Sequence, residues 1–63
     1  MIKAYHIESG KWLCTYLKRH LTSKEDDASI FLNKDFILSY IKKINMSPVQ
    51  FKLIKCNYKG ESI

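Results

Sequence analysis

The sequence predicts a small α+β domain in which a three-stranded antiparallel sheet carries one helix. Three stretches alternate apolar and polar side chains with the period of a β-strand, and one stretch between them has the apolar spacing of a helix. The 63 residues allow a single domain, residues 1–63. Hydrophobic residues make up 46% and aromatic residues 13%. Disordered chains are poorer in both classes, so we expect this chain to fold.

Residues 2–8 and 11–19 predict a β-hairpin, because both alternate and Ser9-Gly10 between them is a turn signal. If these two residues alone form the turn, Tyr5 pairs with Cys14 and shares a face with Trp12. A three-residue loop would exchange the partners between the faces. In either register both faces keep apolar surface. In the two-residue register the second face carries Ile2, Ala4, His6, Leu13, Thr15 and Leu17.

Residues 33–45 predict the helix. Asn33 is a suitable N-cap, and Asp35 suits the positive end of the helix dipole. Pro48 disfavours helical geometry in the residue before it, so the helix ends ahead of that point. Leu38 lies outside the apolar stripe that we expect to face the core. That stripe consists of Phe36, Ile37, Tyr40, Ile41 and Ile44.

The remaining segments complete a β-β-α-β order. Residues 20–27 are polar and predict a loop, and Phe31 is expected to fill the core just before the helix. Residues 49–58 predict the third strand, and residues 59–63 a polar tail that frays. The simplest compact arrangement places the third strand beside the first and antiparallel to it, in the order 2-1-3. The helix then covers one face of the sheet.

The net charge of +5 is unevenly distributed. Residues 9–24 and 36–60 contain basic residues and no acid, whereas Glu25-Asp26-Asp27 form an acidic run. Such segregation favours an acidic partner, either nucleic acid or an acidic protein surface, although a lysine-rich surface that only keeps the protein soluble explains the charge equally well. The basic contact surface would comprise Lys18, Arg19, Lys42, Lys43, Lys52 and Lys55.

Catalytic and cofactor motifs are not found. The sequence has no nucleophile signature and too few glycines for a phosphate-binding loop, and its acidic run lies on a polar loop. We therefore expect a protein that is not an enzyme, with no cofactor, no metal and no small-molecule substrate. The four residues of metal-ligand type have spacings that match no zinc pattern, which favours buried structural roles for them. They are His6, Cys14, His20 and Cys56.

The expected location is the cytoplasm. Two lone cysteines fit a reducing compartment in which both thiols are free. The N-terminal residues contain no apolar run of signal-peptide length, and no stretch approaches a membrane span.

A single helix leaves one face of the sheet uncovered, and that face is the best functional clue in the sequence. Exposed apolar surface of this kind marks contacts with a second copy of the chain or with another protein, and an edge strand offers a further route by strand addition. Strand aromatics beside lysines could also stack on bases, although core packing is the favoured role for Trp12 and most tyrosines. Candidates for the uncovered face are Ile2, Leu13, Leu17 and Ile54.

One resemblance follows from the order of these motifs. A hairpin that contains Gly10-Lys11-Trp12-Leu13 is followed by an acidic loop and by Asp27-Ala28 and Phe31, and then by a short amphipathic helix and a last strand. In this order of motifs the chain resembles small ββαβ proteins encoded by phages and prophages. The resemblance implies a binding role, such as inhibition of host nucleases or polymerases or regulation of phage genes. It carries over no functional residue.

The sequence and the resemblance together lead to two hypotheses. The first is a non-enzymatic phage-type binding protein that docks, in the host cytoplasm, on a host nucleic-acid-processing or defence protein and inhibits or modulates it. The alternative is a small basic nucleic-acid-binding protein or transcriptional regulator.

Overall fold

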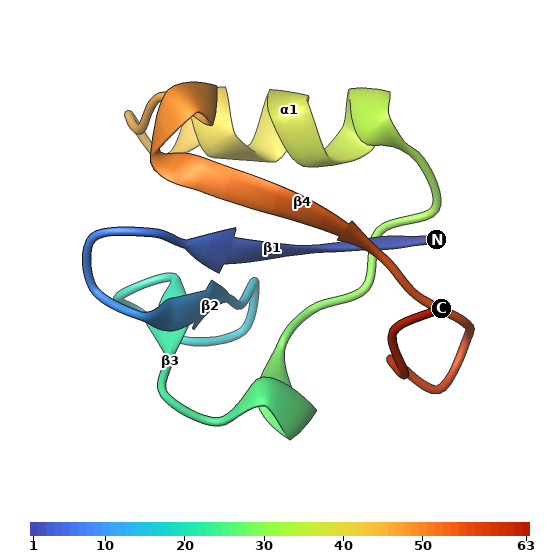
Figure 1. Ribbon diagram of the computed structural model, residues 1–63. Helices are drawn as coiled ribbons and strands as arrows, with labels where there is room; N and C mark the ends of the chain where they lie inside the picture. The colour runs from blue at the N-terminus through green and yellow to red at the C-terminus, as the bar shows by residue number, and fades with distance from the viewer.

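The computed structural model describes residues 1–63 as one helix packed on a four-stranded antiparallel sheet (Figure 1). The strands lie in the order β3-β2-β1-β4. The predicted α+β class is confirmed, and the strand after the helix lies beside the first, antiparallel to it, as expected. The elements are β1 (Ile2–His6), β2 (Lys11–Leu13), β3 (Leu21–Thr22), the 3-10 turn η1 (Glu25–Asp27), α1 (Lys34–Lys43), the 3-10 turn η2 (Pro48–Gln50) and β4 (Phe51–Lys55).

Strand β3 corrects the predicted count of three strands. The second strand ends at Leu13, where the backbone N–H of Cys14 donates to the carbonyl of His20 (2.8 Å) and the chain returns along β2. His20 takes a positive φ of 61°, which reverses the chain direction. Trp12 then pairs with Thr22. The alternation of residues 15–19 resembles strand periodicity but belongs to the loop between β2 and β3.

The loop between β1 and β2 is longer than predicted. His6 pairs with Lys11 and Tyr5 with Trp12, so four residues connect the strands instead of two. Gly10 takes a φ of +71° and its N–H donates to the carbonyl of His6 (2.9 Å). The register differs from the two-residue prediction by two positions. Because the side-chain period of a strand is also two, each residue of β1 and β2 keeps its predicted face, although its cross-strand partner changes.

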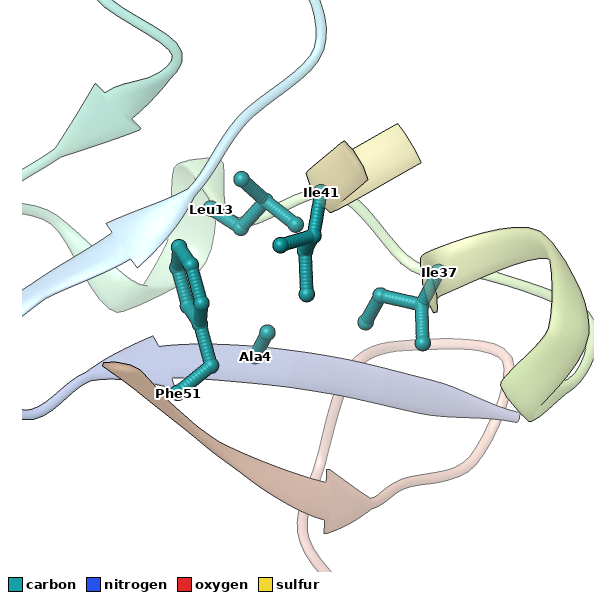
Figure 2. Packing of buried hydrophobic residues seen from close by; sticks show 5 residues of the cluster. All are labelled: Ala4, Leu13, Ile37, Ile41 and Phe51. Atoms are coloured by element: carbon teal, nitrogen blue, oxygen red, sulfur yellow. The ribbon is translucent and has the colours of Figure 1, made fainter. Parts of the chain in front are cut away.

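The core lies between α1 and the sheet (Figure 2). Its side chains come from three strands and the helix: Ala4, Leu13, Ile37, Ile41 and Phe51. Ala4 is small, so α1 can approach β1 closely. Ile37 and Ile41, one helical turn apart, are fully buried, and each contributes about 1.5–3 kcal/mol by leaving water.

The apolar stripe of the helix is rotated slightly from its predicted position. Phe36 is 56% exposed, whereas Leu38, expected to lie off the stripe, packs partly against the core. Ile37 and Ile41 define the centre of the contact, and residues 36 and 38 lie on either side of it. Phe31 packs against the core just before the helix, as predicted.

Both ends of α1 are closed by side-chain or backbone hydrogen bonds. Asn33 is the predicted N-cap, and its Oδ1 accepts from the N–H of Phe36 (3.1 Å). At the other end Asn45 takes a φ of 62°, and the N–H of Met46 donates to the carbonyl of Ile41 (3.0 Å). This is a Schellman ending, with Met46 packed against the core as its apolar contact.

The C-terminal residues, predicted as a polar tail, form a hydrogen-bonded turn. The Oδ1 of Asn57 accepts from the N–H groups of Lys59 (2.9 Å) and Glu61 (3.0 Å) and so holds a tight turn. Ser62 then pairs with Cys56, and the chain returns along the end of β4. The last strand is accordingly shorter than the predicted residues 49–58.

Candidate interaction surface

Two faces of the sheet differ in what covers them. The strand register places Tyr5 beside both Trp12 and Lys52, and Lys3 beside Ile54. Residues directly opposite one another on antiparallel strands share a face. Ala4 and Leu53 pair on the side of the core, so these residues lie on the side away from α1. We call this side the uncovered face, and its residues are Lys3, Tyr5, Trp12, Thr22, Lys52 and Ile54.

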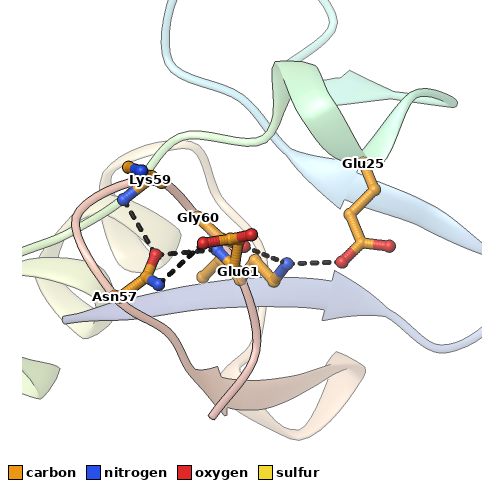
Figure 3. A network of polar contacts seen from close by, with 6 residues as sticks. Glu25, Asn57, Lys59, Gly60 and Glu61 are labelled. Carbon is orange, nitrogen blue, oxygen red and sulfur yellow. Dashed lines mark hydrogen bonds and ion pairs between the residues drawn. The ribbon is translucent and has the colours of Figure 1, made fainter.

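Lys3 closes one end of the uncovered face. Its side chain is only 2% exposed, and its Nζ donates to the carbonyl of Gly60 (2.6 Å) and forms an ion pair with Glu25 (Figure 3). The same Nζ lies 5.0 Å from the centre of the Trp12 ring. Burial of an ammonium is costly, and these three contacts offset the cost. Lys3 thus ties η1 and the C-terminal turn to β1.

A polar cavity of about 390 Å³ lies beside Lys3. Two lysines and three carboxylates line it, and Lys3 is its buried charge. That ammonium is paired with Glu25, donates to the carbonyl of Gly60 and lies 5.0 Å from the centre of the Trp12 ring, so its partners come from the chain itself. We therefore interpret the cavity as a consequence of the contacts by which Lys3 holds η1 and the C-terminal turn to β1. Its lining residues are Lys3, Glu25, Asp26, Ala28, Ile30, Lys59, Gly60 and Glu61.

The rest of the uncovered face is aromatic and aliphatic with one lysine. The Tyr5 and Trp12 rings meet edge to face, with centroids 5.1 Å apart and planes at 65°. Lys52 is exposed beside Tyr5, and Ile54 is half-buried. We call Tyr5, Trp12, Lys52 and Ile54 the aromatic patch. Tyr and Trp are enriched in the cores of protein interfaces because they combine a large apolar body with a polar end.

The structure places only one of the four residues predicted for the uncovered face on that face. Ile54 is there. Leu13 is fully buried in the core under α1, and Ile2 packs against the same core. Leu17 lies in the loop after β2 and is 39% exposed. The prediction failed because the helix covers the side of Ala4 instead of the side of the aromatic residues.

A sequence signal for the correct face was present. Lys3 is the only charged residue within β1, between two apolar residues that face the core. Its alternation partner is Tyr5, and Thr22 and Lys52 add further polar side chains to the same face. The side of the hairpin that carries a lysine is the poorer candidate for the core, although it carries more aromatic rings.

Three of the predicted basic residues are brought to one side of the molecule. The Nδ1 of His20 and the hydroxyl of Tyr40 are 2.7 Å apart, which joins the loop of Lys18 and Arg19 to α1. Lys43 follows Tyr40 by three residues and so lies on the same side of the helix, whereas Lys42, two residues after Tyr40, does not. Burial, and to a smaller extent the nearby Cys14 side chain, raises the pKa of Tyr40 above its ordinary value of 10.0.

The other two predicted basic residues do not join this group. Lys52 and Lys55 are both exposed on β4, but Lys52 belongs to the uncovered face. Lys55 pairs with Ile2 and therefore lies on the side of the helix. The six lysines and arginines thus form no single continuous surface, because β4 directs its two lysines to opposite faces.

Residues of metal-ligand type remain apart, and no group of three or more His, Cys, Asp or Glu side chains could hold a metal ion. Cys14 and Cys56 are free thiols, and both are buried. The Nδ1 of His6 is 2.7 Å from the hydroxyl of Ser9, a contact that stabilises the loop after β1.

No helix has the length and hydrophobicity to cross a bilayer. Comparisons with family models, with curated proteins and with solved structures find no match for this chain.

Proposed function

We propose that this chain is a non-enzymatic binding protein that docks on another protein through its aromatic patch. The single observation that supports this proposal is the uncovered face, where the side chains of Tyr5, Trp12 and Ile54 remain partly exposed. Lys52 adds a positive charge at its margin, and the net charge of +5 favours an acidic partner surface.

The partner class in this proposal is a host protein that processes nucleic acid or defends against phage, which the chain inhibits or modulates. This class rests on the resemblance to small ββαβ phage proteins. A non-catalytic role is supported by the engagement of Lys3, whose ammonium is bonded to Glu25 and Gly60 and so acts as a structural link instead of a base.

A capture experiment with matched charge reversals tests this proposal. Lys52→Glu changes the aromatic patch, and Lys42→Glu makes the same change on α1; both side chains are exposed. We expect tagged wild type to recover a specific host protein from lysate. With that protein purified, Lys52→Glu should weaken its binding at least tenfold, whereas Lys42→Glu should leave it within about twofold. Equal losses for the two variants would contradict docking through the aromatic patch.

Direct nucleic-acid binding is the second candidate, and the contact between His20 and Tyr40 favours it. This contact holds the loop that carries Lys18 and Arg19 against α1, the helix that carries Lys43. Phosphate contacts release counterions, so a double variant Lys18→Glu and Arg19→Glu should weaken binding and reduce the salt slope by about two. A gel-shift series with DNA and RNA from low to physiological salt measures both. Absence of any shift at low salt would eliminate this candidate.

A further inference from the structure

We propose that residues 61–63 form a strap that closes the outer edge of β4, and that opening this strap allows β4 to pair with a second copy of the chain. Strand β4 lies at the end of the sheet, with β1 as its only neighbouring strand. An exposed strand edge is a template for pairing with another chain unless the protein covers it. The strap does not rest on the proposed host partner, and the two are tested separately.

The hydrogen bonds between β4 and β1 decide which backbone groups point to the outer edge. The N–H of Ile7 donates to the carbonyl of Gln50 (3.0 Å), and the N–H of Cys56 donates to the carbonyl of Met1 (2.9 Å). Hydrogen-bonded positions alternate along an antiparallel strand, so the even-numbered residues from 50 to 56 bond to β1. The odd-numbered residues from 51 to 57 therefore direct their backbone groups outwards.

The strap covers the last part of this edge in the way that a short antiparallel strand would. The N–H of Asn57 donates to the carbonyl of Glu61 (2.9 Å), and the N–H of Ile63 donates to the carbonyl of Lys55 (3.4 Å). These bonds use outward groups that a second strand would need. The strap therefore lies where the strand of another chain would have to lie.

The 3-10 turn η2 covers the first part of the same edge. The N–H of Phe51 donates to the carbonyl of Pro48, so this group is not free to bond to a second strand. Between η2 and the strap, Leu53 is the one outward residue whose N–H and carbonyl are both without a partner. A single residue offers too few hydrogen bonds to hold a partner strand. With the strap closed, the chain should therefore not pair through β4.

The strap is held by exposed hydrogen bonds and not by apolar packing. All three of its residues are exposed, and Ile63 is 84% exposed. The side chain of Asn57 supplies the local bonds, because its Oδ1 accepts from the N–H of Glu61 (3.0 Å) and its Nδ2 donates to the Oε1 of Glu61 (3.0 Å). Segments with few buried contacts and exposed hydrogen bonds open first. The strap should therefore open without unfolding of the sheet.

Gly60 is the hinge at which the strap leaves the rest of the chain. Its φ of +85° lies in a region that glycine adopts without strain. The Nζ of Lys3 donates to the carbonyl of Gly60 (2.6 Å), so the turn before the strap stays attached to β1 when the strap opens. Opening adds the backbone groups of Lys55 and Asn57 to those of Leu53. An antiparallel pairing of this edge with the same edge of a second copy is symmetric, so one contact serves both chains.

The substitution Asn57→Ala in the full chain tests the strap, with Asn33→Ala as the matched control. Each removes an asparagine side chain that accepts from backbone N–H groups, one at the strap and one at the start of α1. We expect Asn57→Ala to sediment with a mass that rises with concentration above that of the 7.4 kDa wild type. Exchange of its Leu53 amide should slow about tenfold from micromolar to millimolar concentration. Wild type and Asn33→Ala should show no such slowing. An Asn57→Ala chain whose Leu53 amide stays unprotected would overturn the inference, and so would protection of that amide in wild type.

A disulfide that locks the strap closed separates edge pairing from a general loss of stability. Ser62 lies opposite Cys56 in an antiparallel bridge whose hydrogen bonds flank the pair, so their Cα atoms are within reach of a disulfide. In the double variant Asn57→Ala with Ser62→Cys, oxidation should abolish the association and reduction should restore it. Peptide mapping identifies the bond, because the third thiol, Cys14, is fully buried. Association of the oxidised and reduced forms to the same extent would contradict pairing through β4.

Discussion

The two faces of the sheet are stabilised in different ways. On one face, α1 closes over Ala4, Leu13 and Phe51, and nearly all of the full apolar burial is concentrated there. On the other face no helix is present, and a buried lysine holds η1 and the C-terminal turn against β1. A chain of this length can close one apolar core. Its second face is stabilised by polar links and remains partly exposed.

The largest loss of stability is expected for a substitution on the face of the sheet that α1 covers. Ile41 is fully buried between α1 and the sheet, so Ile41→Ala removes apolar contacts and leaves a cavity. The free energy of unfolding should fall by about 3 kcal/mol, a large share of the stability of a domain this small. Denaturant unfolding followed by Trp12 fluorescence measures it. A loss below about 1 kcal/mol would show that the core does not depend on this contact.

An intermediate and asymmetric effect is expected at the ion pair of Lys3 and Glu25. Glu25→Ala leaves an ammonium that is 98% buried without its counter-charge, and should cost about 2–3 kcal/mol. Lys3→Met leaves a carboxylate that is half-exposed and can be hydrated, so it should cost about 1 kcal/mol. The same unfolding measurement compares the two variants. A larger cost for Lys3→Met would show that packing of the lysine stem outweighs the charge.

The smallest effect is expected at Ile54 on the uncovered face. This side chain is half-buried, so Ile54→Ala should cost about 1 kcal/mol or less, against about 3 kcal/mol for the same substitution at Ile41. Thermal unfolding of the two variants makes the comparison direct. Equal costs at the two positions would mean that the two faces are packed alike and would remove the basis of the comparison.

The sequence predicts the elements whose signals are local. Asn33 marks the start of α1 because its side chain caps the helix by itself, and the alternation of residues 2–6 and 51–55 identifies β1 and β4. Strand β3 escaped prediction because a strand of two residues has no period of its own and exists only through pairing with β2. The C-terminal turn escaped because its order depends on Asn57 and on the bond from Lys3 to Gly60.

The candidate site was predicted less well than the fold because it depends on which face the helix covers. Local pattern placed Tyr5 and Trp12 on one face and Ala4 and Leu13 on the other, which the structure confirms. The choice of the face that the helix covers depends on tertiary contacts. It was settled by the small side chain of Ala4 and by Lys3, whose partners Glu25 and Gly60 lie far away in the sequence.

The most direct measurement of the central claim is site-specific photocrosslinking from each side of the molecule. A benzophenone amino acid is placed at Lys52 on the uncovered face and, as the matched control, at Phe36 on α1, which is 56% exposed. Irradiation of the tagged chain in host lysate should give covalent adducts, with a second copy or with a partner protein, from position 52 and few or none from position 36. Adducts formed mainly from position 36 would contradict the assignment of the uncovered face as the binding side.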